Sequence, residues 1–375
     1  MKNVVIVGFN RSAFTPAYKG QLKKIRPDDL VASVVRGLVE KTGVNPDAIE
    51  DLILGCAFPE GEQGFNLARL VVHLAGLPVR IAGMTINRFC GSSMQAIHAA
   101  AGAIQLNAGE VFICAGVESM TRIPMGGYNF MPNPALYDRY PQAYISMGET
   151  AENLAKRYAI SRSEQEDFAL LSQQKACAAQ QQGYFTDEII TIDNITADGC
   201  LRPDSTLAAM AQLPLAFSAT GSVTAATASP LTDGAAAVLV CSEDYAQAHQ
   251  LHPLARLKAI AVSACEPDIM GIGPVAATHK ALQRAGLTLD DIDLVELNEA
   301  FAAQVLAVLK DLPVPLHKLN IDGGAIALGH PLGATGARIV GKAASLLCRE
   351  HKRYALATQC IGGGQGIATI LEAMS

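Results

Sequence analysis

The sequence predicts an α/β protein built from two similar halves, in which helices cover the faces of β-sheet. Strand-like apolar runs alternate with helical segments along most of the 375 residues, and such alternation is typical of sheets with helices packed on them. A pattern of helix, glycine and strand at Val34–Leu54 returns at Thr278–Leu297, with Gly43 and Gly286 at equivalent places. A glycine in this position ends a helix, because it adopts the left-handed conformation without strain. The repeat predicts two halves packed face to face, with functional loops near the axis that relates them.

A second, looser repeat supports the same duplication. Each copy has a strand-like run, a loop rich in small residues, an apolar helix and a further strand. The first copy comprises Met84–Asn87, Met94–Ile104 and Val111–Gly116, and the second comprises Leu316–Asn320, Ala334–Leu347 and Tyr354–Thr358. The spacing differs from that of the first repeat, so one half carries insertions.

The region between the two halves has a different composition, with Pro, Tyr, Met and charged residues. Helices are predicted at Thr150–Tyr158 and Arg162–Gln182, the second opened by a capping box of Ser161 and Glu164. We expect this insertion to lie over the first half as a lid or binding loop. The expected division is 1–117 with 216–247 for the N-terminal half, 118–215 for the inserted loop domain and 248–375 for the C-terminal half.

Composition restricts the class of protein. Half of the residues are hydrophobic and 17% are charged, as in a globular protein. The net charge of −6 and the absence of Trp argue against a nucleic-acid partner. No apolar run is long enough to span a membrane. The nine cysteines are scattered, no signal peptide precedes the first strand and no Cys-x-x-Cys pair is present, so we expect free thiols, a cytoplasmic location and no metal site.

Cys90 stands between a predicted strand and a predicted helix, in the small-residue segment Cys90–Ser93. The dipole and free N–H groups of a helix N-terminus favour a thiolate there and can stabilise a carbonyl oxygen that becomes negative. We therefore interpret Cys90 as a nucleophile. The alternative is a small buried apolar residue, which is the interpretation that we prefer for four other cysteines, Cys56, Cys114, Cys241 and Cys265.

Two further loops carry chemistry near the C-terminus. His330 lies between a glycine and a proline, a suitable setting for a base that faces a ligand. Cys360 opens the glycine-rich segment Cys360–Gly366, in which the Lys-Ser/Thr of a phosphate-binding loop is missing. Backbone N–H groups beside a thiol indicate instead an oxyanion hole next to a second acid/base. Asn298, at the end of a predicted strand, can fix a water or carbonyl group and can also cap the following helix, and these two interpretations are compatible.

The segments Asn87–Ala96, Asn298–Gln304, Gly323–Gly336 and Cys360–Gly366 together resemble the signature motifs of the thiolase family. The resemblance runs from the first strand to the last and includes Met147–Glu152 and Ser229. Within the family it is strongest to bacterial degradative 3-ketoacyl-CoA thiolases. It implies a duplicated five-layer α-β-α-β-α architecture with an inserted loop domain.

The resemblance also implies roles for individual residues. Cys90 attacks the 3-keto carbonyl of a 3-ketoacyl-CoA and keeps the shortened acyl group, His330 accepts the thiol proton, and Cys360 protonates the departing acetyl-CoA enolate. One oxyanion hole is His330 with a water held by Asn298, and the other is the N–H groups of Cys90 and Gly362. The residues implied for the pantetheine arm and its thioester end are Ala228, Ser229, Phe301 and Met147. Coenzyme A is a substrate, and no tightly bound cofactor is implied.

Some features depart from the family pattern. Ser146 stands where acetoacetyl-specific thiolases usually have His, the loop Asp193–Arg202 is short, and Pro230 replaces a customary glycine. The alternatives are an acetoacetyl-CoA-specific acetyltransferase, a ketoacyl synthase (disfavoured by the second cysteine), and a non-catalytic acyl-CoA or lipid binder. A scaffold role beside a hydratase/dehydrogenase subunit is compatible with catalysis. We expect a homodimer or a dimer of dimers.

Overall fold

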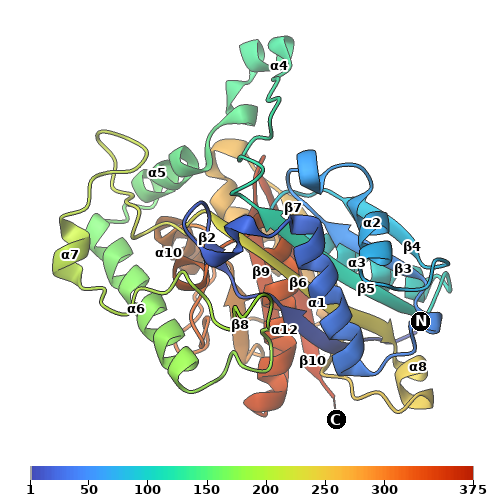
Figure 1. Cartoon of the computed structure of the whole chain (residues 1–375). Coiled ribbons are helices and arrows are strands. Elements are labelled where there is room, and N and C mark those ends of the chain that lie inside the picture. The colour runs from blue at the N-terminus through green and yellow to red at the C-terminus, as the bar shows by residue number, and fades with distance from the viewer. Residues whose placement is uncertain (1, 375) are drawn as a thin grey trace.

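The structure is a computed structural model that describes residues 2–374. Its strands form one mixed sheet in the order β4-β3-β5-β6-β1-β7-β10-β9-β8, with β2 added beside β6 (Figure 1). The N-terminal part comprises β1 (Val4–Arg11), β2 (Thr15–Pro16), α1 (Pro27–Thr42), β3 (Asp51–Gly55), α2 (Leu67–Leu74), β4 (Ala82–Ile86), α3 (Ser92–Gln105), β5 (Val111–Ser119), β6 (Thr232–Ser242) and α8 (Glu243–Ala248). The C-terminal part comprises β7 (Ala255–Ala264), α9 (Gly273–Ala285), β8 (Leu294–Leu297), α10 (Ala302–Asp311), α11 (Ala325–Leu328), α12 (Leu332–Arg349), β9 (Tyr354–Ile361) and β10 (Gln365–Ala373).

Only a short ladder joins the two parts of the sheet. β1 pairs with β7 through Val5–Arg256 and Ile6–Ala255, whereas the ladders within each part are longer. β3 lies parallel to both β4 and β5, and β8 lies parallel to β9. The other paired strands are antiparallel.

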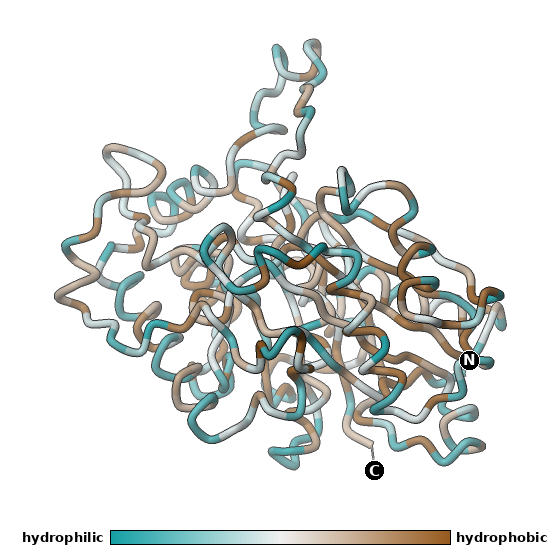
Figure 2. Tube along the Cα trace, viewed as in Figure 1, coloured by the Kyte–Doolittle hydropathy of each residue, from teal (hydrophilic) through white to brown (hydrophobic). Residues whose placement is uncertain are grey.

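Alternating side chains on the strands build three apolar layers, which give the predicted five-layer arrangement. On β1, Val5 and Val7 face α1 and α2, whereas Val4 and Ile6 face α3 and α12. On the far side, β7–β10 pack against α9 and α10. Figure 2 shows hydrophobic residues along the central strands and hydrophilic residues on the outer turns. Among residues 2–374, no helix combines the length and hydropathy needed to span a membrane.

The predicted internal repeat is confirmed. α1 ends at Gly43 and α9 ends at Gly286, and both glycines are left-handed, with φ of 64° and 67°. β3 and β8 follow at equivalent places. In the second repeat Leu316–Asn320 forms no strand, because only Leu319 makes an isolated bridge, to Val295. β4 therefore has no full counterpart in the C-terminal part.

The helices between the two parts do not lie where the sequence suggested. α5 (Met147–Arg157) and α6 (Arg162–Gln181) pack against the C-terminal part, not over the N-terminal one. Their apolar faces decide this, since Phe168 joins the cluster of α9 and α10, and Ala176 packs on Leu328. The two short helices are α4 (Pro134–Arg139) and α7 (Leu207–Ala211). α4 lies on an arm that projects from the body (Figure 1).

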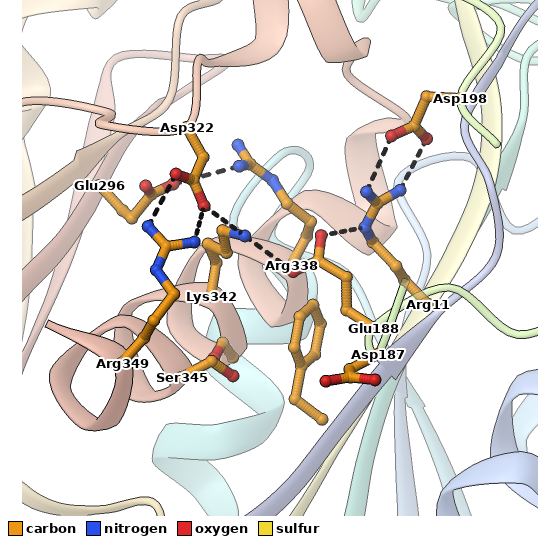
Figure 3. Close-up of polar contacts among 12 residues, drawn as sticks. Arg11, Asp187, Glu188, Asp198, Glu296, Asp322, Arg338, Lys342, Ser345 and Arg349 are labelled. Carbon is orange, nitrogen blue, oxygen red and sulfur yellow. Dashed lines mark hydrogen bonds and ion pairs between the residues drawn. The ribbon is translucent and has the colours of Figure 1, made fainter. Parts of the chain in front are cut away.

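After α6, the chain returns to the N-terminal part, where buried ion pairs hold it (Figure 3). Arg11 of β1 donates to both carboxylate oxygens of Asp198, at 2.7 and 2.8 Å, and to Glu188 at 2.8 Å. Lys342 of α12 joins Glu188 to Asp322, at 3.0 and 2.7 Å. Because these side chains are almost fully buried, their charges depend on one another. The network connects β1, the insertion and α12.

Candidate active site

The loop between β4 and α3 presents Cys90 at the start of α3. Phe89 has a φ of 43°, which few residues other than glycine adopt. Ser92 supports the turn, since its hydroxyl accepts from the Arg88 N–H at 2.9 Å and donates to the Phe89 carbonyl at 2.6 Å. The Cys90 side chain packs with Ala57 and Leu332 and is 8% exposed. Leu332 comes two residues after His330, so the His330 loop reaches this cluster.

Burial determines the protonation of Cys90. It raises the pKa of the thiol to about 11, although the N–H groups of Gly362 and of Cys90 itself hydrogen-bond to the sulfur and act in the opposite direction. The N–H groups thus favour the thiolate, as expected at this helix N-terminus, but desolvation outweighs them and the resting thiol keeps its proton. A base is needed to activate this cysteine.

The second cysteine lies at the end of β9, beside the first. Cys360 pairs with Gly366 of β10, and the turn between them contains Gly363 and Gly364, both with positive φ. Burial, followed by the proximity of Cys90, raises the pKa of Cys360 well above its ordinary value. Cys90, Cys360 and the Gly362 N–H thus come together from the two parts of the fold.

His330 is held at both ring nitrogens. Its Nε2 lies 3.3 Å from the side-chain nitrogen of Asn298, and its Nδ1 lies 2.6 Å from Oγ1 of Thr335. Thr335 in turn donates to the Pro331 carbonyl at 3.3 Å. If Asn298 donates to Nε2, the ring proton is on Nδ1 and faces Thr335. Burial, with Arg338 as a second cause, lowers the pKa of His330 to about 3. The ring is therefore neutral near pH 7 and can accept a proton.

Asn298 does not cap the following helix. α10 begins at Ala302 with Phe301 in the N-cap position. The Asn298 amide contacts His330 instead, and its Oδ1 is buried without a hydrogen-bond partner among residues 2–374. Of the two interpretations of Asn298, the structure contradicts the helix cap.

The residues predicted for substrate binding lie around Cys360. Met147, Ala228 and Phe301 share one apolar cluster with it. Ala228 forms a bridge with Phe301, and the Ser229 N–H donates to the Ala300 carbonyl at 3.0 Å. A Cβ at Gly362 would lie 3.6 Å from Sδ of Met147. Met147 therefore borders the Gly362 turn.

Two residues near the site were missed in the sequence. Thr335 orients His330, and Glu118 at the end of β5 accepts from the N–H groups of Ala57 at 2.8 Å and Gly333 at 3.0 Å. Glu118 thereby ties the His330 loop to the N-terminal part. Its signal in the sequence was an acidic residue in the otherwise small and apolar run Val111–Ser119.

Other features contribute nothing to this site. Cys56, Cys114 and Cys241 are buried, as predicted, whereas Cys265 is only half-buried. A cavity of about 520 Å³ between the end of α1 and the second half of α12 is lined by none of the predicted site residues. Among residues 2–374, no group of three or more His, Cys, Asp or Glu side chains is placed to bind a metal ion.

Comparison with known proteins identifies the family. The family models "Thiolase, N-terminal domain" and "Thiolase, C-terminal domain" match residues 4–244 and 251–373. A 3-ketoacyl-CoA thiolase of Vibrio cholerae is 48% identical over 387 aligned residues, covering 99% of this chain and 100% of that protein. One from Bacillus subtilis is 42% identical over 389 residues, with the same coverage.

Solved structures agree. The crystal structure of human mitochondrial 3-ketoacyl-CoA thiolase matches with a TM-score of 0.92 and 40% identity, over 100% of this chain and 99% of that one. Its complex with CoA matches with the same TM-score. This chain belongs to the thiolase family.

Proposed function

We propose that the protein is a 3-ketoacyl-CoA thiolase, which uses CoA to cleave a 3-ketoacyl-CoA into acetyl-CoA and a shortened acyl-CoA. The observation that carries this proposal is the proximity of two buried thiols, Cys90 and Cys360, the first of which accepts a hydrogen bond from the Gly362 N–H. Full-length relatives with this name support the substrate class.

In the first half-reaction, the thiol of Cys90 loses its proton to Nε2 of His330 and attacks the 3-keto carbonyl carbon. The bond between that carbon and the α-carbon breaks, and its electron pair stays on acetyl-CoA as an enolate. Cys360 protonates the α-carbon of this enolate, and the acyl group remains on Cys90 as a thioester. The raised pKa values of both thiols support this order, because each holds its proton until it is needed.

In the second half-reaction, the thiol of a new CoA attacks the thioester. Between the half-reactions the proton on His330 passes to the Cys360 thiolate, which restores both groups. His330 then accepts the proton of the CoA thiol, and the Cys90 sulfur leaves with the electron pair of the broken bond and takes this proton from His330. A neutral His330 is required at the start of each half-reaction, and burial, which lowers its pKa, keeps the resting ring neutral.

Two oxyanion holes accompany these steps. The N–H groups of Cys90 and Gly362 bind one oxygen. His330, with a water held by Asn298, binds the other. The buried, unpartnered Oδ1 of Asn298 supports a water at this place.

The cluster around Cys360 receives the CoA arm. Ala228 and Ser229 hold the pantetheine, while Met147 and Phe301 line its thioester end. The packing of Ala228, Met147 and Phe301 beside Cys360 supports this arrangement. The related human enzyme forms a complex with CoA.

We further propose that the active form is a homodimer or a dimer of dimers. β4 is an edge strand, and such an edge is open to pairing with another chain. Large exposed apolar side chains lie on or near this edge, among them Phe65, Val79, Met84 and Phe89. We also propose a hydratase/dehydrogenase subunit as a further partner and a cytoplasmic location, since a reducing compartment suits the nine free thiols.

The test is CoA-dependent thiolysis by the purified chain over a series of 3-ketoacyl-CoA substrates, from acetoacetyl to long chains. We expect turnover to extend to medium and long chains. Turnover of acetoacetyl-CoA alone would make the protein an acetyl-CoA acetyltransferase. Ser146, which caps α5 through a capping box with Glu149, stands where such enzymes usually have His. Binding of acyl-CoA without turnover would favour the non-catalytic relative.

A further inference from the structure

A polar bridge connects the segment before Cys90 to the turn after Cys360. Nη1 of Arg88 donates to Oε1 of Gln365 at 2.9 Å, and Nε2 of Gln365 donates to the Gly362 carbonyl at 3.3 Å. The N–H of the same Gly362 hydrogen-bonds to the Cys90 sulfur. The bridge therefore begins and ends beside one thiol, although its members come from opposite ends of the chain.

We propose that Arg88 and Gln365 are positioning residues that hold the Gly362 N–H against Cys90. This inference deepens the proposed function and rests on it, because that N–H is one of the oxyanion donors. Neither residue touches the reacting atoms in this account, so both act through Gly362.

The chemistry of the carboxamide explains why Gln suits position 365. A guanidinium donates only, so Arg88 requires the oxygen end of the amide, and this leaves the nitrogen end to face the Gly362 carbonyl. A residue without both ends cannot join the two groups. The following Gly363 and Gly364 have positive φ, so the turn contains no side chain that could hold Gly362.

A second carboxamide, on Gln359 before the turn, also links the end of β9 to the Cys90 loop. Nε2 of Gln359 donates to the Cys90 carbonyl. Its contact fixes the end of β9, whereas Gln365 fixes the turn beyond Cys360. Gln359 lies directly before Cys360 in the strand and cannot reach past it to orient Gly362, so the two contacts have different roles.

The test compares Gln365→Met and Arg88→Lys with the unchanged enzyme. Arg284→Lys serves as control, because the exposed Arg284 donates to the Ile260 carbonyl, away from the bridge. Loss of a well-placed oxyanion donor lowers kcat by orders of magnitude, so misplacement in Gln365→Met should lower kcat about tenfold, with the KM for CoA within about twofold. Arg88→Lys keeps one donor, so its kcat should lie between that of Gln365→Met and that of the unchanged enzyme. Thermal unfolding confirms that each variant is folded.

Alkylation of Cys90 by iodoacetamide, followed by peptide mass spectrometry, gives a readout that a merely structural role would not change. The titratable groups near this thiol are Glu118 on β5, Cys360 on β9 and, in the proposed reaction, His330, and all three stay unaltered. Because the Gly362 N–H favours the thiolate, Gln365→Met should slow alkylation at about pH 9 by roughly threefold or more. The exposed Cys348 is an internal reference that should react as before.

Alkylation and kcat both unchanged in a folded Gln365→Met variant would overturn the proposal, and so would a failure of both variants to fold, which would make the bridge structural. If the unchanged enzyme shows no thiolysis, the proposed function fails, yet the alkylation comparison still decides whether the bridge positions Gly362.

Discussion

Oγ1 of Thr335 lies 2.6 Å from Nδ1 of His330, and this contact fixes the ring whose other nitrogen faces Asn298. Replacement by valine keeps the shape of the side chain but removes the hydroxyl. Since general acid–base catalysis contributes roughly 10²–10⁴-fold to rate, loss of ring orientation in Thr335→Val should lower kcat by about tenfold or more. Thr335→Ser retains the hydroxyl and should keep most of the activity. Equal kcat values for the two variants would contradict an orienting role.

The resting state of Cys90 makes a prediction about pH. Because burial raises the pKa of its thiol to about 11, the reactive thiolate is a minor form near neutrality. Its alkylation by iodoacetamide should therefore accelerate by about tenfold per pH unit between about pH 7 and pH 10. A rate that levels off below about pH 8 would mean that the thiolate is already formed at rest.

The buried ion pairs predict a large stability effect at Asp198. Asp198→Asn removes one of the two carboxylates that pair with the fully buried Arg11. This loss should lower the free energy of unfolding by about 3 kcal/mol. Asp47→Asn is the matched control, since Asp47 pairs with Arg80 on the surface, and its urea midpoint should hardly change. Equal midpoints for both variants would show that the buried network contributes no more than a surface pair.

Gly324 predicts a stability effect that reaches the site. A Cβ there would lie 2.1 Å from the carboxylate carbon of Glu299, which is held by Ser172 at 2.6 Å and by Asn320 at 2.7 Å. Overpacking costs about 1–3 kcal/mol, so Gly324→Ala should destabilise the fold by that amount and lower kcat, because Glu299 adjoins Asn298. At Gly102, within α3, an added Cβ would meet no atom within 4 Å apart from its own helix backbone and chain neighbours. Gly102→Ala should therefore stabilise the fold by about 0.5–1 kcal/mol. Urea unfolding of both variants gives the comparison.

Local patterns in the sequence predicted local structure well. Gly43 and Gly286 end their helices because left-handed caps favour glycine, and Ser161 with Glu164 forms the expected capping box. Loops rich in small residues indicated Cys90 and Cys360 as candidate site residues. Contacts between distant segments were not predictable in this way. The lid expected over the N-terminal half packs elsewhere, because Phe168 joins the cluster of α9 and α10 and Ala176 joins Leu328, all more than a hundred residues further along the chain.

The protonation of Cys90 shows the same limit. The helix N-terminus is visible in the sequence, but the burial that raises the pKa of the Cys90 thiol involves Ala57 and Leu332, which only the fold brings close. Thr335 and Glu118 were missed for this reason as well. Their hydrogen bonds depend on where the His330 loop meets the N-terminal part.

The central claim is that Cys90 carries the acyl group during turnover. The most direct measurement is mass spectrometry of the enzyme mixed with a medium-chain 3-ketoacyl-CoA in the absence of free CoA, followed by peptide mapping. We expect release of acetyl-CoA and one adduct with the mass of the shortened acyl group, on the peptide that contains Cys90, and no adduct in Cys90→Ala. An acyl group on another residue, or an adduct that persists in Cys90→Ala, would contradict it.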